Sequence, residues 1–371
     1  MSEHKTIGLS GVDLSRSDAI TSLSHHSPAT HGMLRVALEI QDSTITSAQP
    51  LLGSMHRGAE KLFESRDYRQ VLGLANRHEW LSAYSGEVGV AQLVEQALGM
   101  EVPQSAKVYR LMMLEVSRIT SHLAFLAGFP WPLSDSVQAA REQREKLVAH
   151  IRMYTGSRMH HMLTRIGGLT HAPSNEWLIE LFLILREVST YVSELNLTDI
   201  ESFSGIGVLS NSLAIQHSLS GPVARASGYR IDLRNNDEIL AGIPQWSTCV
   251  EHNGDVAARL TVLMREIQTS ALCVLALEDV LLAATSDEVN VLLPKVLRVP
   301  EGQYEHSIET PLGIASWYLV SRGDKMPYRL KLRPASLNTV LAIPDVLIGQ
   351  HIDNVDSIIA SMPFVAGDVD R

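Results

Sequence analysis

The chain has 371 residues, of which 45% are apolar and 19% are charged, a composition typical of a globular protein and not of a disordered or fibrous one. Its 41 acidic residues outnumber its 31 lysines and arginines, and the formal net charge of -10 argues against nucleic acid as a partner. No run of about 18 apolar residues occurs, and the N-terminus lacks the pattern of a signal peptide, so we expect no membrane crossing.

The N-terminal part is predicted to hold a lead-in and a small sheet. Residues 1–30 are rich in Ser, Thr and His, and we interpret them as a flexible lead-in. Residues 33–45 alternate weakly between apolar and polar side chains, which predicts a short strand pair. We assign residues 31–50 to an N-terminal antiparallel sheet and expect sheet structure to be concentrated there. Residues 31–371 are expected to form one domain, whose part from 51 to 371 is a helical body with irregular and strand segments toward the C-terminus.

Three long helices are predicted from the spacing of apolar residues. Between Pro103 and Gly128 apolar side chains recur every three or four residues, and the prolines after Gly128 end the helix. A second helix begins near Ser174, a plausible N-cap, and runs to about Leu195. The third and longest is expected to span approximately residues 255–283. Helices of this length usually pack into a bundle, so the predicted fold class is α+β, a mainly helical bundle with a small sheet.

Cysteine usage limits the redox chemistry of this chain. The only cysteines, Cys249 and Cys273, lack C-x-x-C spacing. Iron–sulfur clusters are usually held by several thiolates, and nickel–iron chemistry needs soft sulfur ligands. We therefore predict no metal or redox cofactor bound by this chain itself, and we interpret Cys273 as a small buried hydrophobe. The paired histidines at 25–26 and 160–161 lack the helical spacing of a metal site.

Two segments near the N-terminus carry polar side chains suited to binding. His31 stands beside Gly32, which would let a ligand approach the backbone. A neutral imidazole donates one hydrogen bond and accepts another, which suits proton exchange, although a histidine satisfied within the fold is the more ordinary interpretation. Arg57, Glu60 and Lys61 lie within about one helical turn of each other, and an exposed ion-pair network is the ordinary interpretation there.

Further polar residues are candidates with simpler alternatives. Trp80 ends the polar segment 76–80, and its indole N–H needs an acceptor if it is buried. In the predicted long helix His122 shares a stripe with Glu115 and Arg118, which form an ordinary i,i+3 ion pair. The last five residues, 367–371, contain two carboxylates and a guanidinium, for which a solvated tail is the ordinary interpretation.

The order of these segments, more than any one of them, resembles a known family. Over nine-tenths of the chain is similar to the quinone-proximal, 49 kDa-type (D-type) subunit of proton-pumping NADH-quinone oxidoreductase, a metal-free relative of the nickel–iron hydrogenase large subunit. The motifs that carry the resemblance are P-x-T-H-G-x-L-R at 28–35, H-R-G-x-E-K at 56–61, R-x-x-S-H-L at 118–123, G-x-R-M-H at 156–160, R-I-G-G at 165–168, G-P-x-x-R-A-S-G at 221–228, P-Y-R-x-K-x-R at 327–333 and G-D-x-D-R at 367–371.

The resemblance implies a function for several of these residues. A quinone headgroup is expected beside the N-terminal sheet, where His31 matches the headgroup-binding histidine of the family and Trp80 occupies the position of its tyrosine. Arg57 matches the arginine beside the iron–sulfur cluster of a partner subunit, and His122 is assigned to the same cofactor-binding side. NADH would be oxidised at a distant subunit, so no activity is expected from the isolated chain.

Partners and location also follow from the resemblance. We expect contacts with the B-type iron–sulfur subunit, with the C-type and I-type subunits and with the H-type membrane subunit of the same complex. These contacts would place the chain on the cytoplasmic side of the cell membrane, where it would be peripheral.

Several departures from the family pattern point to a divergent second copy. Trp80 cannot supply a proton near neutral pH as a phenol does. The acidic residue expected after the long helix is missing, with Asp135 the closest carboxylate, and Ser202 and Ser204 stand where an arginine is usual. A structural paralogue that docks on the cluster-bearing subunit without turnover is therefore an alternative. An active nickel–iron hydrogenase large subunit would require C-x-x-C motifs, which the sequence lacks.

Overall fold

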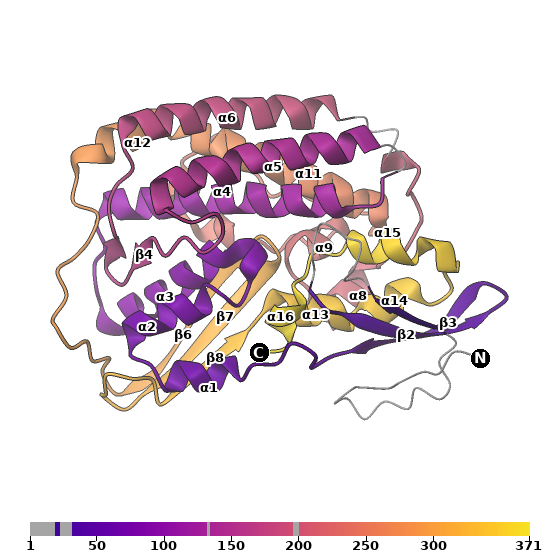
Figure 1. The fold of residues 1–371 in the computed structure, drawn as a ribbon, viewed down its shortest axis with the longest axis horizontal. Coiled ribbons are helices and arrows are strands. Elements are labelled where there is room, and N and C mark those ends of the chain that lie inside the picture. The colour runs from indigo at the N-terminus through magenta and orange to yellow at the C-terminus, as the bar shows by residue number, and fades with distance from the viewer. Residues whose placement is uncertain (1–18, 23–31, 132–133, 196–199) are drawn as a thin grey trace.

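The structure is a computed structural model that describes residues 19–22, 32–131, 134–195 and 200–371. His31 lies outside the described residues. Figure 1 shows a layer of long helices above a second layer of sheets and shorter helices. The fold is α+β, as predicted from the sequence.

The long helices form a bundle. Its members are α4 (Gln104–Gly128), α5 (Ser134–Thr155), α6 (Asn175–Glu194) and α11 (Val256–Ala276). Helix α4 packs against α5 and α11, and α6 packs against the same two helices, so the four close on a common interior (Figure 1). The Ser174 side chain accepts a hydrogen bond from the Trp177 N–H and caps α6, as predicted. Pro103 precedes α4 and the extended Phe129 ends it, which confirms the predicted long helix.

The prediction of one helix over residues 255–283 is wrong. Helix α11 ends at Ala276, Leu277 leaves the helical geometry, and a separate helix α12 (Glu278–Ala283) follows. Glu278 and Asp279 stand in the first turn of α12, where carboxylates favour a helix start. Apolar periodicity continues across the break, because both helices bury the same side, and so the sequence pattern alone does not reveal it.

Sheet structure is not concentrated in the N-terminal region, contrary to the prediction. The N-terminal sheet has the order β1 (Ala19–Ser22), β2 (Arg35–Gln41) and β3 (Thr44–Leu51), and β1 lies within the segment expected to be a lead-in. A second three-stranded antiparallel sheet contains β6 (Gly302–Thr310), β7 (Gly313–Ser321) and β8 (Arg329–Arg333). Its strand β6 places a polar side chain, His306, on the face that α3 (Ala83–Leu98) covers, which weakens the period-two pattern there.

Helices cover one face of this second sheet. The inner face carries Trp317, Leu319 and Leu332, and α1 (Ala59–Glu64) and α3 (Ala83–Leu98) pack against the sheet. Gly89 of α3 makes this contact possible, since a Cβ there would lie only 2.6 Å from the Trp317 indole nitrogen. The outer face is polar.

The remaining elements connect these layers. They are α2 (Tyr68–Ala75), η2 (Trp80–Ser82), β4 (Thr164–Arg165), β5 (Gly168–Leu169), α8 (Asn211–Gln216), α9 (Gly221–Ala226), η3 (Leu233–Asn236), α10 (Glu238–Ala241), η4 (Ala284–Ser286), α13 (Ala335–Leu341), α14 (Ile343–Leu347), η5 (Ile352–Asn354), α15 (Val355–Ala360) and α16 (Ala366–Val369). In the described ranges, none of the helices combines the length and apolar character needed to span a bilayer.

Candidate functional site

The C-terminal residues fix the loop that carries Arg57. The Asp370 carboxylate accepts hydrogen bonds from the backbone N–H of Gly53 at 2.7 Å and of Met55 at 2.8 Å. The Nδ1 atom of His56 lies 3.2 Å from the Asp370 carbonyl oxygen. The interpretation of the C-terminus as a solvated tail is therefore wrong, because its carboxylate is buried and organises a loop from the other end of the sequence.

The start of the N-terminal sheet lies against the same C-terminal segment. A Cβ added at Gly32 would lie 3.0 Å from the Cβ of Ala366 in α16 and 3.0 Å from the Met55 sulfur. Gly32 also has a φ of +85°, which favours glycine. The residue that follows His31 in the chain is thus held between α16 and the loop that carries Arg57.

Three exposed arginines gather beside this loop. Arg57 donates a hydrogen bond to the Arg77 carbonyl oxygen at 3.3 Å. Arg77 reaches the Met162 sulfur at 3.8 Å, and Arg165 donates to the Met162 carbonyl oxygen at 2.8 Å. Within the described ranges no carboxylate forms an ion pair with any of these arginines. We call Arg57, Arg77 and Arg165 the arginine patch, a surface that attracts negatively charged groups.

Trp80 opens η2 at the end of the segment that follows α2. Its side chain is half-buried, and its indole nitrogen is shielded from solvent without a hydrogen-bond partner among the described residues. A buried indole N–H normally has an acceptor. Trp80 therefore has a donor available for a bound ligand.

A small cavity, which we call the cavity behind Trp80, is lined by His78 and Glu79, the two residues that precede Trp80 in the chain. Its walls include His78, Glu79 and Asp368, all buried. Burial and the nearby Asp368 raise the pKa of Glu79 well above its usual range, and burial raises the pKa of Asp368 to about 7. Burial, with Arg57 and Arg371 adding to it, lowers the pKa of His78 to about 4. His78 and Glu79 belong to the polar segment 76–80, and Asp368 to the motif at 367–371, but nothing in the sequence indicates that they share one cavity, because the burial of a carboxyl beside a carboxyl is not visible in the local pattern.

The motifs and this geometry agree with a match to a known family. The family model of the respiratory-chain NADH dehydrogenase 49 Kd subunit matches residues 135–291 and 283–371. The chain belongs to this 49 kDa subunit family.

Individual relatives extend the match along the whole chain. The D-type subunit numbered 2 of the NADH-quinone oxidoreductase of Streptomyces griseus is 39% identical, with 99% of this chain and 95% of the relative covered. The D-type subunit numbered 1 of Streptomyces coelicolor is 40% identical, with coverage of 99% and 98%. The D-type subunit of Carboxydothermus hydrogenoformans is 33% identical, with coverage of 92% and 96%. The predicted resemblance to the D-type subunit is confirmed, and the numbered copies among the relatives fit a divergent second copy.

A solved structure supports the fold over nearly the same length. A chain of the membrane-bound sulfane sulfur reductase, an archaeal respiratory membrane complex, superposes with a TM-score of 0.87 at 26% identity, covering 97% of this chain and 100% of that chain. The chain is accordingly of a kind found as a subunit of an oxidoreductase complex, and this structural neighbour belongs to a membrane-bound respiratory complex.

His122 lies in the interior of this 49 kDa-type fold. Its Nε2 atom is 3.0 Å from the Glu266 carboxylate, and burial lowers the pKa of His122 while Glu266 opposes that shift. It belongs to a buried charge network, whose members are Glu115, Arg118, His122, Arg225, Asp232, Arg234, Glu266 and Glu309. His122 does not line the cavity behind Trp80, and its assignment to the cofactor-binding side stays a prediction.

Arg225 is the centre of the buried charge network. Its guanidinium lies 2.7 Å from Glu266 and 2.7 Å from Glu309, and 3.5 Å from Asp232. Burial would raise the pKa of Glu266, but Arg225, His122 and Arg234 hold it well below its usual range. The network ties α4, α9 and α11 to the second sheet.

Metal-ligating side chains do not cluster in the described part of the 49 kDa-type chain. No group of three or more His, Cys, Asp or Glu residues within it is placed to hold a metal ion. Cys249 and Cys273 are buried free thiols, and burial raises the pKa of Cys273 to about 12. A thiol with such a pKa is not a ready thiolate ligand near neutral pH. The side chain of Asp135, the closest carboxylate to the missing acid, lies outside the described residues.

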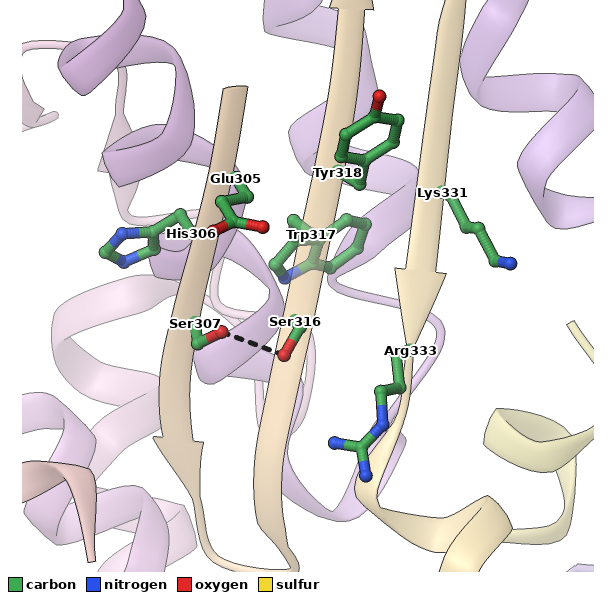
Figure 2. Close-up of a pocket in the computed structure, with 8 residues that line it drawn as sticks. All are labelled: Glu305, His306, Ser307, Ser316, Trp317, Tyr318, Lys331 and Arg333. Carbon is green, nitrogen blue, oxygen red and sulfur yellow. Dashed lines mark hydrogen bonds between the residues drawn. The ribbon is translucent and has the colours of Figure 1, made fainter. Parts of the chain in front are cut away.

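A polar groove of about 330 Å³ crosses the outer face of the second sheet. Figure 2 shows Glu305 and Ser307 on β6, Tyr318 on β7, and Lys331 and Arg333 on β8 around it. The hydroxyl groups of Ser307 and Ser316 lie 2.8 Å apart and join two of these strands. This groove is separate from the cavity behind Trp80, although Trp317 borders both.

Proposed function

We propose that this chain is the quinone-site subunit of the peripheral arm of a proton-pumping NADH-quinone oxidoreductase. The quinone headgroup binds near Trp80 and the C-terminal segment with His31 as a ligand, and electrons arrive from an iron–sulfur cluster held by a partner subunit. His31 donates a hydrogen bond to one quinone oxygen and stabilises the negative charge that develops on it. The indole N–H of Trp80 donates to the other oxygen.

The single observation that carries this proposal is the meeting of distant segments at α16. Gly32, next to His31, lies against Ala366. Asp370 holds the loop of Arg57 through hydrogen bonds. Arg57 in turn donates a hydrogen bond to the segment that leads to Trp80. Described residues of the motifs at 28–35, 56–61 and 367–371 therefore lie together, and Trp80 has an indole donor without a partner among the described residues. The arginine patch beside them supports the docking of a cluster-bearing partner on that side.

Replacement of His31 tests the proposal in the assembled complex. We expect His31→Ala to abolish most quinone reductase activity while the complex still assembles, because the charge on the quinone oxygen then lacks its donor. His351→Ala is the matched control, since His351 is an exposed histidine that pairs with Asp353. Activity in the His31→Ala complex equal to that of the control would refute the proposal.

The proposed partners follow from the same arrangement. The B-type iron–sulfur subunit would dock on the arginine patch, the C-type and I-type subunits would complete the peripheral arm, and the H-type membrane subunit would hold the chain at the cytoplasmic side of the cell membrane. Charge reversal by Arg57→Glu should release the iron–sulfur subunit when the complex is purified. Recovery of the complete complex with this variant would contradict the predicted interface.

A second candidate function is a structural paralogue that docks but does not turn over. Trp80 in the position of the family's tyrosine favours it, because an indole cannot supply a proton near neutral pH. Deletion of the gene decides between the two candidates. Loss of quinone-linked respiration supports the quinone-site subunit, whereas normal respiration with the partner still recovered in a pull-down supports the paralogue.

A further inference from the structure

The cavity behind Trp80 has polar walls and little space. It holds about 10 Å³, which is close to the room needed by a single water molecule. Around it the described residues leave several buried polar atoms without a hydrogen-bond partner: Oε1 of Glu79, Oδ2 of Asp368, both ring nitrogens of His78 and the indole nitrogen of Trp317. A water molecule in such a site needs about two to four polar partners, and these atoms provide them.

The two carboxyl groups in this cavity are unlike the other buried acids of the chain. Glu266 and Glu115 contact arginines directly, whereas no arginine or lysine forms an ion pair with Glu79 or Asp368 within the described residues. Glu79 accepts hydrogen bonds from the hydroxyl groups of Ser82 and Thr310, and Asp368 accepts hydrogen bonds from Ser336. Two carboxyl groups that share a buried site do not both ionise, so the pair retains a proton at neutral pH.

The charged groups that face this pair come from several elements. Arg118 of α4 acts on Glu79, and Arg371 at the chain end acts on Asp368. Burial lowers the pKa of His78, and Arg57 and Arg371 lower it further, so this imidazole stays neutral. A neutral imidazole accepts a proton on one nitrogen and releases one from the other. His78 is therefore suited to pass a proton out of the cavity.

Both carboxyl groups are adjacent in sequence to the walls of the candidate site. Glu79 immediately precedes Trp80, and Asp368 lies two residues after Ala366, which lies against Gly32. The cavity is thus lined by residues of the same two segments that border the proposed quinone site. A proton held there is available to a bound acceptor, and Trp80 itself has none to give.

We propose that Glu79 and Asp368 share one proton and, through a bound water molecule and His78, deliver it to the reduced quinone. This inference rests on the proposed function. The two electrons come from the partner's iron–sulfur cluster, and in each of two successive deliveries an O–H bond of the carboxylic acid breaks as one of the two O–H bonds of the quinol forms. The carboxyl pair then regains its proton from solvent. Glu79 and Asp368 are positioning residues in this scheme, since they act through His78 and do not touch the quinone.

Infrared difference spectroscopy of the complete complex tests for the shared proton. We expect the C=O band of a protonated carboxylic acid at neutral pH, a shift of this band in D2O, and its loss when quinone is reduced under conditions that prevent reprotonation. The band should be absent in Glu79→Gln and in Asp368→Asn. Absence of the band from the unaltered complex overturns the proposal, and this measurement requires no variant to fold.

Steady-state kinetics test the delivery. We expect Glu79→Gln to lower kcat for quinone reduction by at least about tenfold, to leave KM unchanged, and to make the rate fall more steeply as pH rises. Glu79→Asp should restore part of the rate, and Glu305→Gln, on the exposed outer face of the second sheet, is the matched control. A kcat and pH profile equal to those of the control would overturn the proposal. If His31→Ala is inactive while Glu79→Gln is normal, only this inference fails, whereas an active His31→Ala complex refutes the proposed function itself.

Discussion

Removal of the Arg225 guanidinium should destabilise the chain more than any surface substitution. The side chain is fully buried and bonds two carboxylates at 2.7 Å, and it also donates to the Ile231 carbonyl oxygen at 3.0 Å. In Arg225→Met these groups stay buried while Arg118 and Arg234 alone face the acids of the buried charge network. Breaking one buried pair costs about 3–5 kcal/mol, and we expect about 5 kcal/mol here because more than one carboxylate loses its partner.

Such a loss is a large part of the stability of a folded protein, which is about 5–15 kcal/mol. Urea unfolding of the purified chain, followed by tryptophan fluorescence, measures it, and Trp246 is a local probe because Arg234 lies 4.5 Å from its ring centroid. Arg186→Met is the matched control. Arg186 pairs with Glu278 at 2.5 Å on the surface, and its loss should cost at most about 1 kcal/mol.

The pH dependence provides a separate check of the same reasoning. In the native network the pKa of Glu266 is lower than in the unfolded chain. The ionised Glu266 therefore stabilises the native state above its unfolded pKa, and this stabilisation is lost as the pH falls through its folded pKa. In Arg225→Met the unpaired acids have raised pKa values, so the variant regains stability as the pH falls. The difference between the two proteins should therefore shrink in acid. A difference below about 1 kcal/mol at neutral pH, or one that grows in acid, would refute this account.

Three further predictions concern the site and its supports. Trp80→Phe should raise KM for quinone about two- to tenfold, the worth of one hydrogen bond, while Trp80→Tyr should keep KM and raise kcat; equal kinetics in both would contradict the donor role of the indole. Gly168→Ala should lower the free energy of unfolding in urea by more than about 2 kcal/mol, because its Cβ would lie 1.9 Å from the Val289 carbonyl oxygen. The control is Gly99→Ala, which is also at positive φ but in open space and should lower it by only about 1 kcal/mol. Asp368→Asn should reduce the pH dependence of stability. The raised folded pKa of Asp368 makes the native chain lose stability as the pH rises from 3.8 to about 7, so denaturation curves across that range should show a smaller slope for the variant than for the parent, and equal slopes would contradict the raised pKa.

In the proposed function, the arginine patch serves electron transfer and the cavity behind Trp80 serves proton transfer. Arg57 and its neighbours are exposed and face outward, which suits a partner that carries the electrons. Glu79 and Asp368 are enclosed and hold the proton. In this division Trp80 needs only to bind and orient the quinone, so the absence of a phenol does not by itself make the subunit inactive.

Short-range signals in the sequence are enough to predict much of the local structure and the family. The apolar period and the flanking prolines located α4, and the Ser174 cap located the start of α6, because these signals act within one or two helical turns. The scarcity of thiols limited the redox chemistry, and the ordered motifs indicated the D-type subunit. Each of these features can be read within a short window of the chain.

Contacts between distant segments settle which polar groups share a buried environment, and no short window of sequence contains them. The bonds from Asp370 to the loop of Arg57 and the packing of α3 against the sheet of β6–β8 join segments that are far apart in the chain. The pairing of Glu79 with Asp368 across one cavity depends on them as well. Burial and the proximity of a second charge set the protonation of a carboxyl group, and both arise only when the chain has folded.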